Sequence, residues 1–168
     1  TPRFERVTAM IDHVSVAVRD LKRASEFYAA VLATLGYAKL DVRPTTIAFG
    51  KKYSEFWINH RPNMMPLPWD CGAHVALRAS NREGVDTFHA AALTRGGTSE
   101  GGPALRPQHG EGYYAAFIRD PDGNRIEFMQ LAIDPHPHQP RFANGSERVS
   151  MLTFAAADQR RLDQQLGP

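Results

Sequence analysis

The sequence predicts an α+β fold in which one βαβββ unit occurs twice. The first observation is an internal repeat: residues 11–36 align with residues 72–97 without a gap, and His13 then coincides with His74. The same register superimposes valine on valine, phenylalanine on phenylalanine and glycine on glycine over 24 positions. The second observation is that each copy begins with a strand-like run and continues with helical spacing. A self-match at a fixed offset indicates two copies of one supersecondary unit.

The first unit is expected over residues 10–60. Residues 11–18 alternate, with valines on one face and small or polar residues, His13 among them, on the other. Asp20 is a suitable N-cap for a helix whose apolar residues recur at helical spacing. Three short strands should follow, at residues 37–42, 45–49 and 55–59. The valine face should pack on the helix, so the face that carries His13 should line a cavity.

The second unit is expected over residues 72–131 and repeats this order. A strand at residues 73–78 leads to a helix that a capping box of Ser80 and Glu83 should begin. Residues 98–112 are rich in glycine and read mostly as a loop. Two more strands, separated by the tight turn DPDGN, are expected at residues 113–119 and 124–131.

Three segments lie outside the repeat. Residues 1–9 form a leader, and residues 61–71 form a linker because three prolines interrupt them. Residues 132–168 form a C-terminal extension that begins with the stiff sequence DPHPHQP. Within the extension, residues 149–154 are apolar enough to need burial. We therefore expect the extension to cover a surface of its own chain or of a partner; the alternative is a disordered tail, which the polar end QRRLDQQ would suit.

Composition excludes several classes of protein. The 168 residues include 20 Lys and Arg against 18 Asp and Glu, and this near balance gives no electrostatic argument for nucleic acid or a membrane surface. The one cysteine, Cys71, excludes an intramolecular disulfide framework. No apolar run reaches transmembrane length, and the first residues lack a signal-peptide core. We expect a cytoplasmic protein that binds neither nucleic acid nor membrane.

Two histidines and one carboxylate are the candidate chemical residues. If the repeats pack about a pseudo-two-fold axis, His13 and His74 approach one shared site. Glu127 occupies the centre of an otherwise apolar strand, where a carboxylate is costly to bury unless it is paired or binds a metal. Two histidines and a carboxylate on neighbouring strands match a ligand set for divalent transition metals. The alternative is that all three are ordinary hydrogen-bonded core or surface residues.

A resemblance to the vicinal oxygen chelate superfamily is carried by the motifs IDHVSVAVRDLKRASEFY, GAHVAL and DPDGNRIEF. That superfamily includes glyoxalase I, fosfomycin-resistance proteins, extradiol dioxygenases and bleomycin-resistance proteins. The resemblance implies paired βαβββ modules that form a U-shaped mixed sheet around one cavity, with helices on the outer face. It also implies one divalent metal ion (Fe, Mn, Zn or Ni) held by His13, His74 and Glu127, and it implies that homodimers are common.

One position departs from glyoxalase I. That family takes a further carboxylate ligand from the last strand of the first module, where the present sequence reads SEFWINH and places Trp57. Glu55 shares the face but lies one pleat away. The resemblance therefore implies three protein ligands, as in fosfomycin-resistance proteins and extradiol dioxygenases. Trp57 then either walls the substrate pocket or belongs to the core.

Two further residues are candidates for roles in the cavity. His109 lies in a glycine-rich loop before a strand, where it could serve as a general acid or base, although a surface histidine is the simpler interpretation. Tyr113 and Tyr114 alternate, so one of them should face the cavity and bind substrate; we take Tyr113. The predicted catalytic residues are therefore Glu127 and His109.

Two functions remain open from the sequence. The first is a glyoxalase-like, metal-dependent enzyme whose small substrate is chelated through adjacent oxygens, with lyase, isomerase or dioxygenase chemistry. The second is a metal-free protein of the bleomycin-resistance type that binds a small molecule or drug. In either case the expected partners are a small molecule and a second copy of the chain.

Overall fold

The structure is a computed structural model, and it describes residues 11–131. Its elements, in chain order, are β1 (Val14–Val18), α1 (Leu21–Ala33), β2 (Ala38–Arg43), β3 (Thr46–Gly50), β4 (Ser54–His60), β5 (Val75–Arg78), α2 (Arg82–Thr94), β6 (Thr98–Leu105), the short 3-10 helix η1 (Pro107–His109), β7 (Tyr113–Arg119) and β8 (Arg125–Leu131). The predicted α+β class with paired βαβββ modules is confirmed, as two mixed four-stranded sheets. The predictions for the leader and the C-terminal extension lie outside the described residues.

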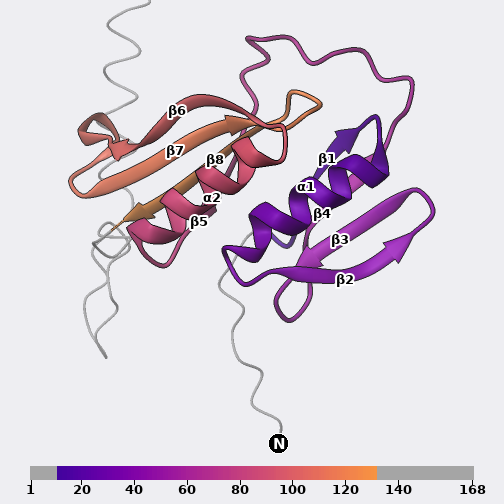
Figure 1. Cartoon of the computed structure of the whole chain (residues 1–168), viewed down its shortest axis with the longest axis horizontal. Helices are drawn as coiled ribbons and strands as arrows, with labels where there is room; N and C mark the ends of the chain where they lie inside the picture. The colour runs from indigo at the N-terminus through magenta and orange to yellow at the C-terminus, as the bar shows by residue number, and fades with distance from the viewer. Residues whose placement is uncertain (1–10, 132–168) are drawn as a thin grey trace, which may run out of the picture. The chain divides into compact units, whose positions relative to one another are not determined.

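The first module has the strand order β1-β4-β3-β2, with helix α1 across one face of the sheet (Figure 1). β1 is parallel to β4, and the other neighbours are antiparallel. Val18 is fully buried, and Val14 and Val16 pack against the same core, so the valine face lies against the helix as predicted. Asp20 caps α1, because its carboxylate accepts a hydrogen bond of 3.0 Å from the backbone N–H of Arg23.

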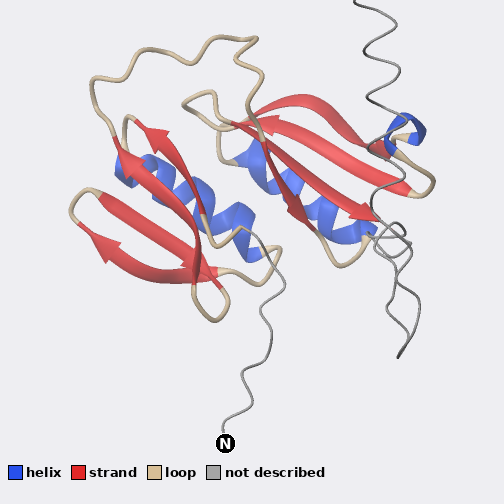
Figure 2. Ribbon diagram, turned by 180° about the vertical axis from the view of Figure 1, so that it is seen from behind, coloured by secondary structure: helices blue, strands red, loops and turns tan. Residues whose placement is uncertain are grey.

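The second module repeats this arrangement with the strand order β5-β8-β7-β6 and helix α2 on one face (Figure 2). The predicted capping box of Ser80 and Glu83 is wrong by one residue. The N-cap is Asn81, whose side-chain oxygen accepts a hydrogen bond of 2.8 Å from the backbone N–H of Gly84. Asparagine is among the strongest N-caps, so it takes this position ahead of the neighbouring serine.

The loop expected at residues 98–112 is also wrong over its first half. Residues 98–105 form strand β6, which pairs antiparallel with β7 and shifts register twice. β6 is an edge strand of its sheet, and edge strands and bulges are where glycine and proline are tolerated in a ladder. Composition alone therefore pointed to a loop, whereas pairing with β7 makes a strand.

Hydrogen bonds at the DPDGN turn connect the second module to the first. Asp120 lies in the turn and is buried, and its Oδ2 accepts a hydrogen bond of 2.7 Å from the Tyr28 hydroxyl on α1. The Asn124 amide donates across to the backbone oxygen of Ala17 at 2.9 Å. Burial raises the pKa of the Asp120 carboxyl, although hydrogen bonds from Asn124, Tyr28 and the turn backbone act in the opposite direction. The motif therefore holds the modules together in addition to turning the chain.

Among residues 11–131, no helix is both long and apolar enough to span a membrane.

Candidate metal and substrate site

The two predicted histidines occupy equivalent places in the modules. His13 comes immediately before β1, and His74 comes immediately before β5. Because successive side chains of a strand alternate between faces, each histidine belongs to the face opposite the valine or apolar face that packs on the helix. Both rings are accessible, with side-chain exposures of 55% for His13 and 47% for His74.

Glu127 is a buried carboxylate on the interior strand β8. Its neighbours Ile126 and Phe128 belong to the hydrophobic core, so the alternation puts Glu127 on the opposite face of the sheet, as predicted. On that face it pairs in register with Ala76 of β5 and Phe117 of β7. Only 5% of Glu127 is exposed, so its charge needs close partners.

Two side chains lie close to the Glu127 carboxylate. The Tyr113 hydroxyl donates a hydrogen bond of 2.6 Å to Oε1, and His74 Nε2 lies 3.3 Å from Oε2. Burial, followed by the hydrogen bond to Glu127 and its charge, raises the pKa of the Tyr113 phenol. The phenol therefore stays protonated at neutral pH and remains a donor. Each carboxylate oxygen has one partner, and together the three residues form a compact acid–imidazole–phenol group.

A cavity adjoins this group. Tyr113 both donates to Glu127 and lines a cavity of about 390 Å³. The cavity wall is formed by Ala76, Arg78, His109, Tyr113, Met129 and Leu131. His109, at the end of η1, packs beside Tyr113 with 5.5 Å between the ring centroids. The predicted residues His109 and Tyr113 therefore lie in one wall, next to the carboxylate.

The first module carries different side chains on the corresponding face. His13 Nδ1 lies 2.7 Å from the carboxylate of Asp12, and the imidazole forms a T-shaped pair with the Trp57 ring at 6.5 Å between centroids. Trp57 pairs in register with Ser15 of β1, which confirms that it belongs to the His13 face. The guanidinium of Arg43 lies 5.5 Å from the Trp57 ring centroid, over its face. Trp57 is half-buried, and its role in binding substrate stays a prediction.

Glu55 has partners of its own in the first module. Its Oε2 accepts a hydrogen bond of 3.4 Å from the backbone N–H of Lys51. Burial first, and then the charge of Glu55 and a hydrogen bond to it, raise the pKa of Tyr37 to about 12. The Glu55 carboxylate is therefore engaged by Tyr37 and the β3–β4 turn, which favours Trp57 as the residue beside His13.

The structure brings together part of the predicted metal triad. His74 and Glu127 are in contact, and His13 is beside Asp12 and Trp57 instead. Within residues 11–131, no three His, Cys, Asp or Glu side chains cluster as a metal site. The complete triad of His13, His74 and Glu127 therefore stays a prediction.

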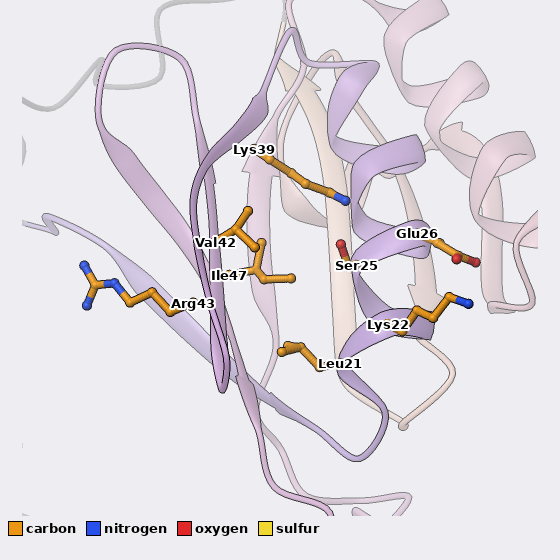
Figure 3. A pocket seen from close by; sticks show the side chains of 8 residues that line it. All are labelled: Leu21, Lys22, Ser25, Glu26, Lys39, Val42, Arg43 and Ile47. Carbon is orange, nitrogen blue, oxygen red and sulfur yellow. The ribbon is translucent and has the colours of Figure 1, made fainter.

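A second cleft, of about 430 Å³, lies between helix α1 and strands β2 and β3 (Figure 3). Sequence reasoning did not anticipate it. Its lining residues are Leu21, Lys22, Ser25, Glu26, Lys39, Val42, Arg43 and Ile47. Figure 3 shows the Lys39 side chain reaching toward α1, whereas Arg43 points away from the helix. Glu26 is the one carboxylate in this lining and no histidine contributes, so the face that holds Glu127 is the better candidate for a metal site.

Sequence reasoning also missed Arg78. The signal was available, because His74, Ala76 and Arg78 follow one another at alternate positions and therefore share one face of β5.

Comparison with known proteins identifies the class to which this fold and site belong. Residues 10–128 match the Glyoxalase/Bleomycin resistance protein/Dioxygenase superfamily, and the chain is a member of that superfamily. The resemblance seen in the sequence motifs is thereby confirmed.

Two curated plant proteins are similar to this chain. The chain is 30% identical over 132 residues to the lactoylglutathione lyase GLX1 of Arabidopsis thaliana, covering 74% of this chain and 45% of that protein. A putative lactoylglutathione lyase of Brassica oleracea var. gemmifera matches to the same extent. This chain thus spans about half the length of the curated relatives it matches.

Solved structures agree on the fold. A glyoxalase/bleomycin resistance protein from Albidiferax ferrireducens T118 superimposes with a TM-score of 0.65 at 34% identity, over 73% of this chain and 99% of that one. A putative glyoxalase from Bacillus halodurans gives a TM-score of 0.58 at 20% identity, over 73% and 96% of the two chains, and supports the fold alone.

Proposed function

We propose that the chain is a metal-dependent enzyme of the lyase or isomerase type, acting on a small substrate that binds through adjacent oxygens. The observation that carries the proposal is the buried Glu127 carboxylate, held between His74 and Tyr113 next to a cavity. The similarity to lactoylglutathione lyases supports lyase chemistry over dioxygenase chemistry.

The donor set fits a divalent ion. An imidazole nitrogen and a carboxylate oxygen from neighbouring strands, 3.3 Å apart, are the ligand types that transition metals share in such sites. When bound, the metal supplies Lewis-acid stabilisation of negative charge on a substrate oxygen. Tyr113 orients Glu127 by donating to Oε1, and this leaves Oε2 directed toward His74. His109, beside Tyr113 in the cavity wall, is placed to exchange a proton with a bound molecule.

The third ligand in this proposal is His13 of a second copy of the chain. Within residues 11–131 the contacts of His13 are with Asp12 and Trp57, while its ring stays accessible to another molecule. Tyr113, which donates to Glu127, also lines an open cavity. A homodimer with two-fold symmetry places the same pair of surfaces together twice, so two identical sites form at once.

A metal-free binding protein is the alternative. One observation favours it: the Tyr113 hydroxyl donates a hydrogen bond to Oε1 of Glu127 and His74 lies 3.3 Å from Oε2, so both carboxylate oxygens have a close polar neighbour without an ion. In that case the cavity beside Tyr113 would bind and sequester a small molecule with no chemical step.

Metal content separates the two functions. We would purify the chain without a histidine tag, incubate it with Fe, Mn, Zn or Ni, and measure bound metal by mass spectrometry. The enzyme proposal expects one ion per site, and it expects His13→Ala, His74→Ala and Glu127→Ala each to lower occupancy while circular dichroism is unchanged. His89→Ala is the matched control, because His89 bonds Ser99 at 2.9 Å on the helix-covered side and should not affect the metal.

Wild-type protein that takes up none of these metals would favour the binding protein. Occupancy that survives Glu127→Ala would show that the triad is wrong.

A further inference from the structure

Arg78 is the one cationic side chain with a permanent charge in the wall of the cavity beside Glu127. It ends strand β5, pairs in register with Met129 of β8, and shares the face of His74 and Ala76. The mechanism proposed above gives it no role.

Arg78 is exposed to solvent and leaves its guanidinium free to meet a bound molecule. Three of the other lining residues, Ala76, Met129 and Leu131, are apolar. Among residues 11–131, Arg78 forms no ion pair with a carboxylate. The carboxylate on the same face, Glu127, is already engaged by Tyr113 and His74. Arg78 is therefore a solvent-exposed cation at the edge of an apolar wall, and no carboxylate of the described part of the chain pairs with it.

The shape and charge of the Arg78 guanidinium match a carboxylate ligand. A guanidinium presents a planar fork of N–H donors that matches a carboxylate through two parallel hydrogen bonds. Met129 and Leu131 supply apolar surface for the hydrocarbon part of such a ligand, and about 390 Å³ is within the usual size of a small-molecule pocket. A neutral ligand of the same shape would leave the guanidinium without its counter-charge.

We propose that this cavity selects a small organic carboxylate and that Arg78 is the residue that determines this charge preference. The inference rests on the proposed function, because it names the charge class of the substrate for the same site. The carboxylate lies at Arg78, the apolar body lies along Met129 and Leu131, and the reacting end is directed toward His109 and Tyr113.

The test uses a matched pair of probes. The binding of 4-fluorobenzoate and of its neutral isostere 4-fluorobenzamide is measured by fluorine NMR, on metal-stripped protein so that the carboxylate cannot simply prefer the metal. Wild type should bind the carboxylate about tenfold more tightly, the size of effect expected of a charge-assisted pair at an accessible site. Arg78→Gln should abolish the preference, and Arg78→Lys should restore part of it.

The control variant is Arg82→Gln. Arg82 lies over the ring of Tyr114, which is not among the residues that line the cavity, so its loss should leave the preference unchanged. A wild-type protein without preference, or an Arg78→Gln variant that keeps it, overturns the inference. Metal titration of the same samples keeps the two proposals apart. Metal binding without charge preference refutes the role of Arg78 alone, whereas an Arg78-dependent preference without metal binding refutes the enzyme proposal alone.

Discussion

The two modules share a topology but differ in what they carry on the face opposite their helix. In the first module that face holds an accessible His13, the Trp57 ring and the Arg43 guanidinium above it. In the second it holds the buried Glu127, bonded by Tyr113 and close to His74. The repeat therefore places a histidine before the first strand of each module, whereas the strands after each helix supply the side chains that surround it. A metal site built from both halves would need one ligand from the first module and two from the second.

The largest expected effect is a difference in metal affinity between the variants Glu127→Gln and Glu55→Gln. Loss of a direct ligand should exceed the roughly 10- to 100-fold cost typical of losing an outer partner, so Glu127→Gln should lower metal affinity by more than about 100-fold. Glu55→Gln should leave the metal affinity unchanged, because Glu55 accepts hydrogen bonds from Tyr37 and from the backbone N–H of Lys51. Spectra of the cobalt-substituted protein provide the measurement. A change of spectrum in Glu55→Gln would reveal a fourth protein ligand and bring the site closer to that of glyoxalase I.

The next effect concerns the orientation of Glu127. Tyr113→Phe removes the 2.6 Å hydrogen bond to Oε1, so metal affinity should fall by about 10- to 100-fold. Tyr114→Phe is the matched control, since its hydroxyl donates to Asp86 at 2.8 Å, away from Glu127. Isothermal titration calorimetry measures both variants. Equal affinities for the two would mean that Tyr113 packs in the wall without positioning the carboxylate.

A third prediction tests whether the modules are held together as described. Tyr28→Phe deletes the buried hydrogen bond to Asp120 and should lower the free energy of unfolding by about 1.5–3 kcal/mol, the range for a hydrogen bond to a charged group. Tyr53→Phe, on an exposed side chain, should change it little. Urea unfolding gives both values. An unchanged midpoint in Tyr28→Phe would contradict the role of the DPDGN turn as a link between the modules.

The smallest effect is a pH dependence confined to the second module. Glu100 lies between two arginines, accepting hydrogen bonds of 2.5 Å from Arg119 and 2.6 Å from Arg125. Burial acts to raise the pKa of Glu100, but the hydrogen bonds and charges of Arg125 and Arg119 outweigh it and hold the pKa below the ordinary value of 4.5. The folded chain therefore binds this proton less readily than the unfolded chain. The resulting stabilisation is present above pH 4.5 and is lost as pH falls through the folded pKa.

The measurement is the free energy of unfolding of Glu100→Gln between neutral and acid pH. The variant should lose less stability on acidification than wild type, whereas Glu83→Gln on α2 should follow the wild-type curve. Parallel curves for wild type and Glu100→Gln would contradict the assignment.

The sequence predicted most of the fold because its signals are local. The valine face of β1 and the Asp20 cap depend on neighbours within a few residues, and the repeat carries the same local signals to the second module. Strand β6 could not be predicted, because its glycines and proline are ordered only by pairing with β7. For the site, the alternation around Glu127 predicted the face of the carboxylate, and the contact with His74 agrees with that prediction.

The partners of His13 could not be predicted in the same way. Asp12 is its sequence neighbour, but the contact with Trp57 depends on the parallel pairing of β1 and β4, which are separated by a helix and two strands. Whether His13 meets His74 depends on how the repeated units assemble, and no local pattern encodes that.

The most direct test of the account asks whether two copies of the chain build one site. Neither His13→Ala nor His74→Ala should hold metal alone. When the two variants are co-expressed in equal amounts, half of the dimers are mixed, and each mixed dimer contains one intact site out of two. Metal occupancy should then recover to about a quarter of the wild-type value. Co-expression of His74→Ala with Glu127→Ala is the control and should recover nothing, because both residues belong to the same module. Recovery in the first pair only is the predicted result; no recovery in either pair would contradict a site shared between two copies.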